Sequence, residues 1–257
     1  MFINNFDPVA FSVFSFEIRW YSLAYIFGIL IGWYLSKKYF IDNEKVKETF
    51  DDYITYIILV IIIGVRLGYV IFYDLSYFLY NPIEILQIWN GGMSFHGGLL
   101  GVILSSIIFA KSKKIEVFEY LDVIAIVTPI GLFFGRIANF INSELYGKST
   151  EVFWSVKFLK VDNISRHPSQ LYEAFLEGII LFFILIYFKS NKKNTSHGFL
   201  SGIFLIFYSI FRFISEFFRV PDPQIGYLVL NLTLGQLISF VFLLFGLILV
   251  SIKYEKR

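Results

Sequence analysis

The chain has 257 residues, of which 57% are hydrophobic and 21% aromatic, whereas only 16% are charged. The mean hydropathy of +0.68 lies well above that of a soluble domain, so the composition indicates a polytopic membrane protein. A formal net charge of +2 without a basic block argues against a nucleic-acid partner. Because the chain has no cysteine, a disulfide, a thiolate metal site and a cysteine nucleophile are excluded within it.

Seven stretches are apolar over the roughly 20 residues that a membrane-spanning helix needs. They lie at residues 18–39, 53–73, 93–110, 118–140, 169–188, 198–218 and 229–252. The first stretch is too long and too aromatic for a signal peptide, which indicates a retained span. No internal repeat or long linker divides the sequence, so we expect one all-α integral membrane domain over residues 1–257 with seven transmembrane helices.

The distribution of Lys and Arg predicts the orientation of this domain. Loops on one side hold 13 of these residues, whereas loops on the other side hold 6. The positive-inside rule therefore places the C-terminus in the cytoplasm and the N-terminus outside. The remaining basic residues, Arg66, Arg136 and Arg212, fall within or at the ends of the predicted spans.

The two longest loops both face outward on this topology. Residues 74–92 carry no Lys or Arg and mix aromatic with polar groups, which is typical of a segment in the lipid headgroup region. Residues 141–168 form a small extracytoplasmic head loop. Within it the alternation in EVFWSVKF, residues 151–158, predicts either a short β element or irregular chain.

Several polar side chains lie in or beside the spans, where a charge costs about 2.5–3.5 kcal/mol at mid-bilayer. At helical spacing are Arg136 with Asn139, Tyr208 with Arg212 and Glu216, and Glu173 with Glu177, while His96 stands between two glycine pairs. Most fall toward the outward half of their spans. Together they predict one polar cavity open to the outer leaflet, and because arginine forks suit phosphate, an anionic lipid is the expected guest.

Each of these residues also has a structural interpretation. Arg212 and Glu216 are four apart and can form an ion pair that orders the helices. Arg66 has no acidic neighbour at helical spacing, so it either packs in the bundle or belongs to a site. His96 is either a packing residue or a base. The three histidines stand in separate segments without ligand spacing, and no metal is expected.

The stretch GRIANFINSELYG, residues 135–147, resembles the signature of the prolipoprotein diacylglyceryl transferases, which are bacterial plasma-membrane enzymes. Its fixed positions are Gly135, Arg136, Asn139, Phe140, Asn142, Glu144 and Gly147. Four further blocks resemble the family, namely RWYSLAY, GGMSFHGGLLG, RHPSQLYEA and FYSIFRFISEFFR. They follow in the expected order across residues 19–219, so the resemblance covers most of the chain.

This resemblance implies transfer of the diacylglyceryl group of phosphatidylglycerol to the lipobox cysteine thiol of a prolipoprotein. A thioether forms and glycerol 1-phosphate leaves, without a cofactor. The implied partners are phosphatidylglycerol, the prolipoprotein signal peptide and membrane lipid, and the implied location is the bacterial plasma (inner) membrane, with the active site toward the outer leaflet. The missing cysteine is then explained, because the sulfur belongs to the substrate.

The resemblance also implies roles for the polar residues. Arg136 and Arg212 would hold the phosphate, Glu216 would fix Arg212, His96 would act as the base, Tyr21 would add a hydroxyl, and Asn139 and Glu144 would position the glycerol head or orient Arg136. His167 and Glu173 match a family block or cap the fifth span, and Tyr208 is a further candidate. An anionic-lipid transporter or flippase is the competing function, although seven spans without mirrored halves argue against it.

Overall fold

The computed structural model describes residues 2–14, 16–88, 91–92, 94–191, 196–221 and 225–255. Not described within these ranges are the side chains of Phe72, Tyr73, Phe95, His96 and residues 253–255. The chain forms two compact units. The first joins Met1–Phe40 to Asp122–Arg257, and the second is Ile41–Leu121.

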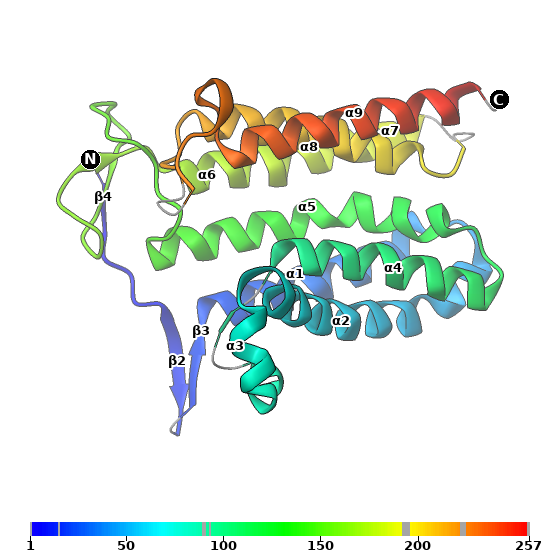
Figure 1. The fold of residues 1–257 in the computed structure, drawn as a ribbon. Helices are drawn as coiled ribbons and strands as arrows, with labels where there is room; N and C mark the ends of the chain where they lie inside the picture. The colour runs from blue at the N-terminus through cyan, green and yellow to red at the C-terminus, as the bar shows by residue number, and fades with distance from the viewer. Residues whose placement is uncertain are drawn as a thin grey trace. The chain divides into compact units, whose positions relative to one another are not determined.

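Helices occur in all seven stretches predicted to span the membrane (Figure 1). Their bounds are Trp20–Leu35 (α1) with a π-helical end at Ser36–Phe40, Glu44–Tyr73 (α2), Phe95–Lys113 (α4), Val117–Asn142 (α5), Ser169–Glu173 (α6) continued by the π-helix Ala174–Ile180 and by Leu181–Asn191 (α7), Phe199–Glu216 (α8) and Leu234–Glu255 (α9). Shorter helices are Leu75–Tyr80 (α3), Pro82–Leu86 and Val229–Asn231. The mostly helical character of the chain is therefore confirmed.

Five helical segments in the described part of the chain are long and apolar enough to cross a membrane. They are Glu44–Ile71, Val117–Asn142, Ser169–Asn191, Phe199–Glu216 and Leu234–Ile252. These helices support a multi-pass membrane protein. Because α1 and α4 are not among the five, the count of seven spans stays a prediction, as does the orientation.

Two small sheets accompany the helices of the first unit. The strands β1 (Phe2–Asn4), β4 (Val156–Phe158) and β5 (Ser165–Arg166) form one sheet, with β1 parallel to β4 and β4 antiparallel to β5. Of the two alternatives left open for residues 151–158, the structure shows the short β element, strand β4, over the last three residues.

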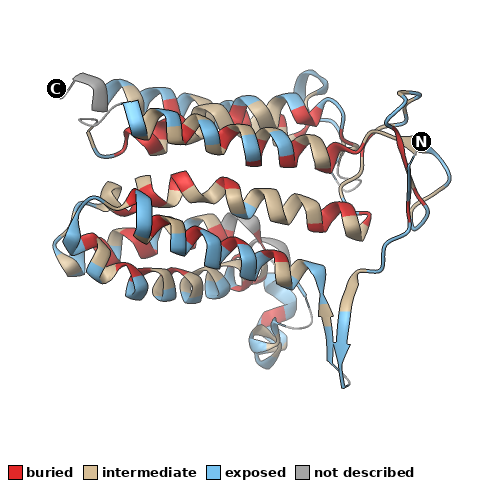
Figure 2. Ribbon diagram, turned by 180° about the vertical axis from the view of Figure 1, so that it is seen from behind, coloured by how far each residue is buried: buried red, intermediate tan, exposed pale blue. Residues whose placement is uncertain are grey.

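The second sheet is a hairpin that the sequence pattern did not predict. Strands β2 (Val9–Val13) and β3 (Phe16–Arg19) pair antiparallel, so α1 begins at Trp20, two residues later than expected. The hairpin is mostly exposed (Figure 2), and its tip residue Phe14 is 99% exposed. Most residues of both strands are exposed. A half-buried strand shows apolar and polar residues in alternation, and this exposed hairpin does not need that pattern.

The N-terminal strand is tied to the end of α5. The buried Asn4 side chain donates through Nδ2 to the Phe140 carbonyl at 2.7 Å, and its Oδ1 accepts from Ser143 Oγ at 3.3 Å. Carbonyls in the last turn of a helix lack an intrahelical partner. Asn4 therefore caps the end of α5, where the polar residues Asn142 and Glu144 follow Phe140.

Glycines bring α2 and α4 together in the second unit. A Cβ at Gly64 would lie 2.6 Å from the Gly97 carbonyl oxygen, and one at Gly68 would lie 2.6 Å from the Gly97 Cα. Small residues four apart let two helix backbones approach closely. Gly97, which follows His96, thus serves close contact between the two helices.

Arg66, whose role the sequence left open, holds the chain that follows α2. Its guanidinium donates to the carbonyls of Ile85 at 2.9 Å, Glu84 at 2.5 Å and Gly91 at 2.5 Å. It also lies 5.2 Å from the ring centroid of Phe78. Arg66 is only 6% exposed, and an unpaired buried cation is costly, so these carbonyls keep the segment after α2 folded against it.

We predict that Arg66→Gln loosens residues 75–86, because a neutral amide cannot replace a fork shared among several carbonyls. Hydrogen exchange of peptides from this segment should become at least about tenfold faster, as expected when charge-assisted bonds of about 1.5–3 kcal/mol are removed. Lys47→Ala, which removes only an exposed pair with Glu44, should leave the exchange unchanged. Equal exchange in both variants would contradict this role.

Candidate active site

Arg136, near the end of α5, lies against two glutamates of the fifth span. Its Nε is 2.8 Å from Glu173 Oε2 and its Nη2 is 3.3 Å from Glu177 Oε2. Both glutamates are fully buried, whereas the Arg136 side chain is 15% exposed. The two carboxylates are therefore more deeply buried than the arginine that they contact.

Arg212 on α8 joins the same two glutamates to a third. Its Nη1 is 2.9 Å from Glu173 Oε2 and 3.7 Å from Glu177 Oε1. Its Nη2 is 2.5 Å from Glu216 Oε1, one helical turn further along. The ion pair expected between Arg212 and Glu216 is thus present, within a larger set of contacts.

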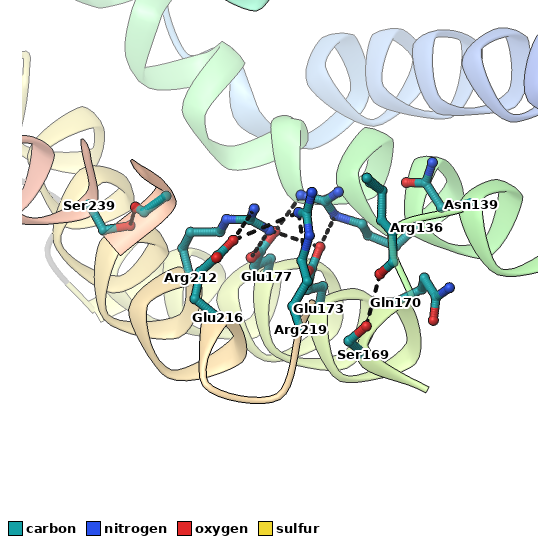
Figure 3. A network of polar contacts seen from close by, with 12 residues as sticks. Arg136, Asn139, Ser169, Gln170, Glu173, Glu177, Arg212, Glu216, Arg219 and Ser239 are labelled. Carbon is teal, nitrogen blue, oxygen red and sulfur yellow. Dashed lines mark hydrogen bonds and ion pairs between the residues drawn. The ribbon is translucent and has the colours of Figure 1, made fainter. Parts of the chain in front are cut away.

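Arg219, after the end of α8, completes the set. Its Nη1 lies 3.8 Å from Glu173 Oε1 and 3.7 Å from Glu216 Oε1. We call these residues the arginine–glutamate network: Arg136, Arg212, Arg219, Glu173, Glu177 and Glu216 (Figure 3). Three cations face three carboxylates, so the network is electrically balanced, which buried charges require.

Local structure explains how the glutamates reach the arginines. Glu173 ends α6, and Glu177 lies in the π-helix Ala174–Ile180, a departure from α-helical geometry that is frequent at functional sites. Next to Glu177, a Cβ at Gly178 would lie 2.7 Å from the Cβ of Phe133 on α5. The bare glycine lets this helix approach α5 and brings Glu177 within reach of Arg136.

A second group of polar residues lies one turn beyond Arg136. The Asn139 Nδ2 donates to Tyr21 Oη at 3.1 Å and to Glu144 Oε2 at 3.1 Å, and Asn142 Nδ2 donates to Glu144 Oε1 at 3.3 Å. We call Tyr21, Asn139, Asn142 and Glu144 the asparagine–glutamate cluster. Ser143, at a φ of 61°, turns the chain back after α5, so Glu144 faces the helix that it has just left.

The structure thus gathers most of the predicted site residues into two groups, to both of which α5 contributes. Arg136, Arg212, Glu216 and Glu173 lie in the network, whereas Asn139, Glu144 and Tyr21 lie in the cluster. The Tyr208 ring, one turn before Arg212, stacks on Phe204 at 5.6 Å. The side chain of His96, the predicted base, lies outside the described residues.

His167 lies in an aromatic group outside the network. Its ring is 5.2 Å from that of Phe218, and its Nδ1 is 3.1 Å from Tyr172 Oη. Trp154 Nε1, which can only donate, donates a hydrogen bond to the same Tyr172 oxygen at 2.6 Å. Because a hydroxyl oxygen has two acceptor positions, either Tyr172 or His167 can be the donor in the contact between them.

The capping role considered for RHPSQLYE is not seen at the start of α6. Pro168 stands at the N-cap without a side-chain cap, and the Ser169 Oγ donates to the Leu145 carbonyl at 2.9 Å instead. Glu173 faces the arginines. Glu177 was among the polar residues of the predicted cavity but received no role from the family resemblance. Arg219 was not predicted, although it follows Glu216 by three residues.

We predict that Glu173→Gln strongly destabilises the protein, because it leaves three buried guanidiniums with two carboxylates. Breaking a buried pair from one side costs about 3 kcal/mol or more. Thermal unfolding in detergent should show a clear loss for Glu173→Gln, and none for Glu151→Gln at an exposed position. Similar unfolding temperatures for the two variants would show that the network does not need Glu173.

We also predict a pH effect from His167. Burial lowers the pKa of this imidazole below its usual value of 6.5. The stability that the neutral ring contributes is therefore present above pH 6.5 and is lost as the pH falls through the lower folded-state pKa. Between pH 7.5 and 5, the unfolding temperature of His167→Phe should fall less than that of the wild type. A parallel fall would contradict the lowered pKa.

Fold and site together define a helical membrane protein with a buried, charge-balanced set of arginines at the ends of its long helices. Comparison with known proteins then places it among its relatives. The chain belongs to the prolipoprotein diacylglyceryl transferase family, whose family model matches residues 8–252.

Similar proteins are found in several Rickettsia species. A phosphatidylglycerol–prolipoprotein diacylglyceryl transferase of Rickettsia bellii is 49% identical, over 100% of this chain and 98% of the relative. Proteins of the same name from Rickettsia felis and Rickettsia typhi are each 49% identical, over 96% of both chains. The resemblance seen in the sequence is therefore confirmed over the full length.

Proposed function

We propose that this protein transfers the diacylglyceryl group of phosphatidylglycerol to the lipobox cysteine thiol of prolipoproteins. The thiolate sulfur attacks the glyceryl carbon, the bond from that carbon to the phosphate oxygen breaks, and glycerol 1-phosphate leaves. The observation that carries the proposal is the full-length likeness to bacterial transferases together with the convergence of the signature arginine on the arginine–glutamate network. No cofactor or metal takes part in this scheme.

The exposure of the network supports phosphate binding by its arginines. The side chains of Arg136 and Arg212 are 15% and 13% exposed, whereas the Glu173 side chain between them is fully buried. Arg136 and Arg212 are therefore more accessible to an entering phosphate than Glu173 is. Because the same cations stabilise charge that grows on the leaving phosphate, they favour the transition state over the bound substrate.

The asparagine–glutamate cluster is suited to the glycerol head of the lipid. Glu144 offers carboxylate oxygens that accept hydrogen bonds from hydroxyls, and the Tyr21 hydroxyl keeps its own proton for donation because it accepts from Asn139. The described contacts of Glu144 are with amides, so we propose that Asn139 and Glu144 recognise the headgroup and that the buried glutamates orient Arg136.

We assign the remaining step, removal of the thiol proton, to His96 at the start of α4. A thiol has an unperturbed pKa near 8.5 and an imidazole near 6.5, so a histidine is suited to this transfer at neutral pH. The glycine contact between α2 and α4 fixes the backbone of the helix that bears His96. Tyr208, His167 and Glu177 have no assigned contact with substrate in this scheme.

We further propose seven spans with the N-terminus outside, the C-terminus in the cytoplasm and the active site toward the outer leaflet of the bacterial plasma membrane. The excess of Lys and Arg in one set of loops supports this topology. On it, residues 74–92 lie at the membrane interface and residues 141–168 form the outward head loop. Both substrates, the lipid and the signal peptide, then reach the site from within the bilayer.

The direct test is transfer from phosphatidylglycerol to a lipobox peptide by the purified protein in detergent, with the thioether product detected by mass spectrometry. The wild type should form the product and release glycerol phosphate, whereas a peptide with serine in place of cysteine should not react. A wild type that makes no product but moves anionic lipid across vesicles would favour the transporter function.

We predict that Arg136→Lys lowers kcat by about 100-fold, because a lysine offers a point charge in place of a fork and leaves Glu173 and Glu177 poorly paired. The matched control is Arg19→Lys, which changes a side chain that is 64% exposed. The control should turn over like the wild type. Near-normal turnover of Arg136→Lys would rule out bidentate phosphate recognition at this position.

A further inference from the structure

The start of α9 contacts the arginine–glutamate network through Glu216. This glutamate is the last residue of α8 and is 4% exposed. Its Oε1 lies 2.5 Å from Arg212 Nη2, while its Oε2 accepts a hydrogen bond from Thr233 Oγ1 at 2.7 Å. One oxygen thus orients the arginine, and the other is held from α9.

Thr233 is itself fixed by a capping box. The Gln236 N–H donates to Thr233 Oγ1 at 3.2 Å, and the Thr233 N–H donates to Gln236 Oε1 at 3.0 Å. Both residues are buried. Because a hydroxyl carries one proton, the bond that it accepts from Gln236 leaves that proton for Glu216. The carboxylate also lies at a helix N-terminus, where negative charge is favoured.

Gly235 leaves room for the same carboxylate. A Cβ at this position would lie 2.7 Å from Glu216 Oε1 and 2.8 Å from its Cδ. Alanine normally stabilises a helix relative to glycine, so a glycine in the first turn of α9 is explained by the space that Glu216 needs. The oxygen that a methyl group would displace is the one that pairs with Arg212.

We propose that Thr233 is a positioning residue for the transfer reaction. It holds Glu216 by one hydrogen bond, Gly235 leaves the carboxylate its place, and Glu216 in turn aims the Arg212 guanidinium at the phosphate. Neither Thr233 nor Gly235 needs to touch the substrate. This inference rests on the proposed role of Arg212, and it adds the start of α9 to the parts of the chain that shape the site.

The test compares Thr233→Val, Thr233→Ser and Gly235→Ala as full-length proteins in detergent, by kcat, by KM for phosphatidylglycerol and by unfolding temperature. Valine keeps the shape of threonine without its hydroxyl, whereas serine keeps the hydroxyl. We expect Thr233→Val and Gly235→Ala to lower kcat about tenfold with little change in KM, since a hydrogen bond to a charged group is lost or displaced. Thr233→Ser should restore most of the turnover.

Two controls separate positioning from general damage to helices. Asn43→Ala removes the N-cap of α2, where the side chain accepts from the Lys45 N–H at 3.0 Å. Gly131→Ala adds a methyl group on α5 where no other atom lies within 4 Å. Both controls should keep the wild-type kcat.

Three outcomes overturn the inference: Thr233→Val with wild-type kcat, equal losses in Thr233→Val and Thr233→Ser, or an unchanged kcat in Gly235→Ala. If Thr233→Val does not fold, Gly235→Ala decides. Arg212→Lys distinguishes failure of the proposed Arg212 role from failure of the Thr233 role. If Arg212→Lys retains turnover, the proposed role of Arg212 fails. If Arg212→Lys loses turnover while Thr233→Val keeps the wild-type kcat, only the role of Thr233 fails.

Discussion

Two glutamates without solvent exposure, Glu173 and Glu177, impose the main constraint on this structure. A buried carboxylate is tolerated only when cations and hydrogen-bond donors surround it. Here the cations come from α5, from α8 and from the chain that follows α8. These segments must therefore pack around the fifth span at fixed distances, and the packing of Gly178 on Phe133 permits that approach. Helices α5, α6 and α8 and the π-helix Ala174–Ile180 meet at this network.

The balance of charge in the network has a functional consequence. The carboxylates keep three guanidiniums close together without a ligand, because arginines that lacked partners would repel one another in a medium of low dielectric. Glu173 and Glu177 are also more deeply buried than Arg136 and Arg212, so these arginines are more accessible than the two carboxylates between them. In the proposed reaction the phosphate binds to preoriented forks, and little reorganisation is needed as charge develops on it.

Helix α5 connects the two polar groups. Arg136 reaches the network and Asn139, one turn later, reaches Tyr21 and Glu144. The end of this helix is held by Asn4 from the first strand, so the N-terminus of the chain contributes to the geometry of residues far along it. The proposed phosphate subsite and the proposed hydroxyl-binding subsite are one helical turn apart on α5, which suits the two parts of a glycerophosphate headgroup.

Relations within single elements were predictable from the sequence. The apolar stretches, the shared face of Arg136 and Asn139, the spacing of Arg212 and Glu216 and the alternation before Phe158 all depend on periodicity, which local backbone geometry sets. The signature residues also identified the family. Contacts between elements were not predictable in the same way.

Only the tertiary structure decided which polar residues meet. Glu177 joins the network through a π-helical segment, Arg219 through the chain after α8 and Thr233 through the start of α9. The Arg66 guanidinium binds backbone carbonyls of the segment after α2. The hairpin at Val9–Arg19 was not predicted, because an exposed hairpin does not need the apolar–polar alternation of a half-buried strand. The sequence by itself determined the membrane character of the chain, its helices and the chemistry of its signature, because these follow from composition and local spacing. The pairing of arginines with glutamates depends on how separate helices pack, which residue spacing along one helix does not report.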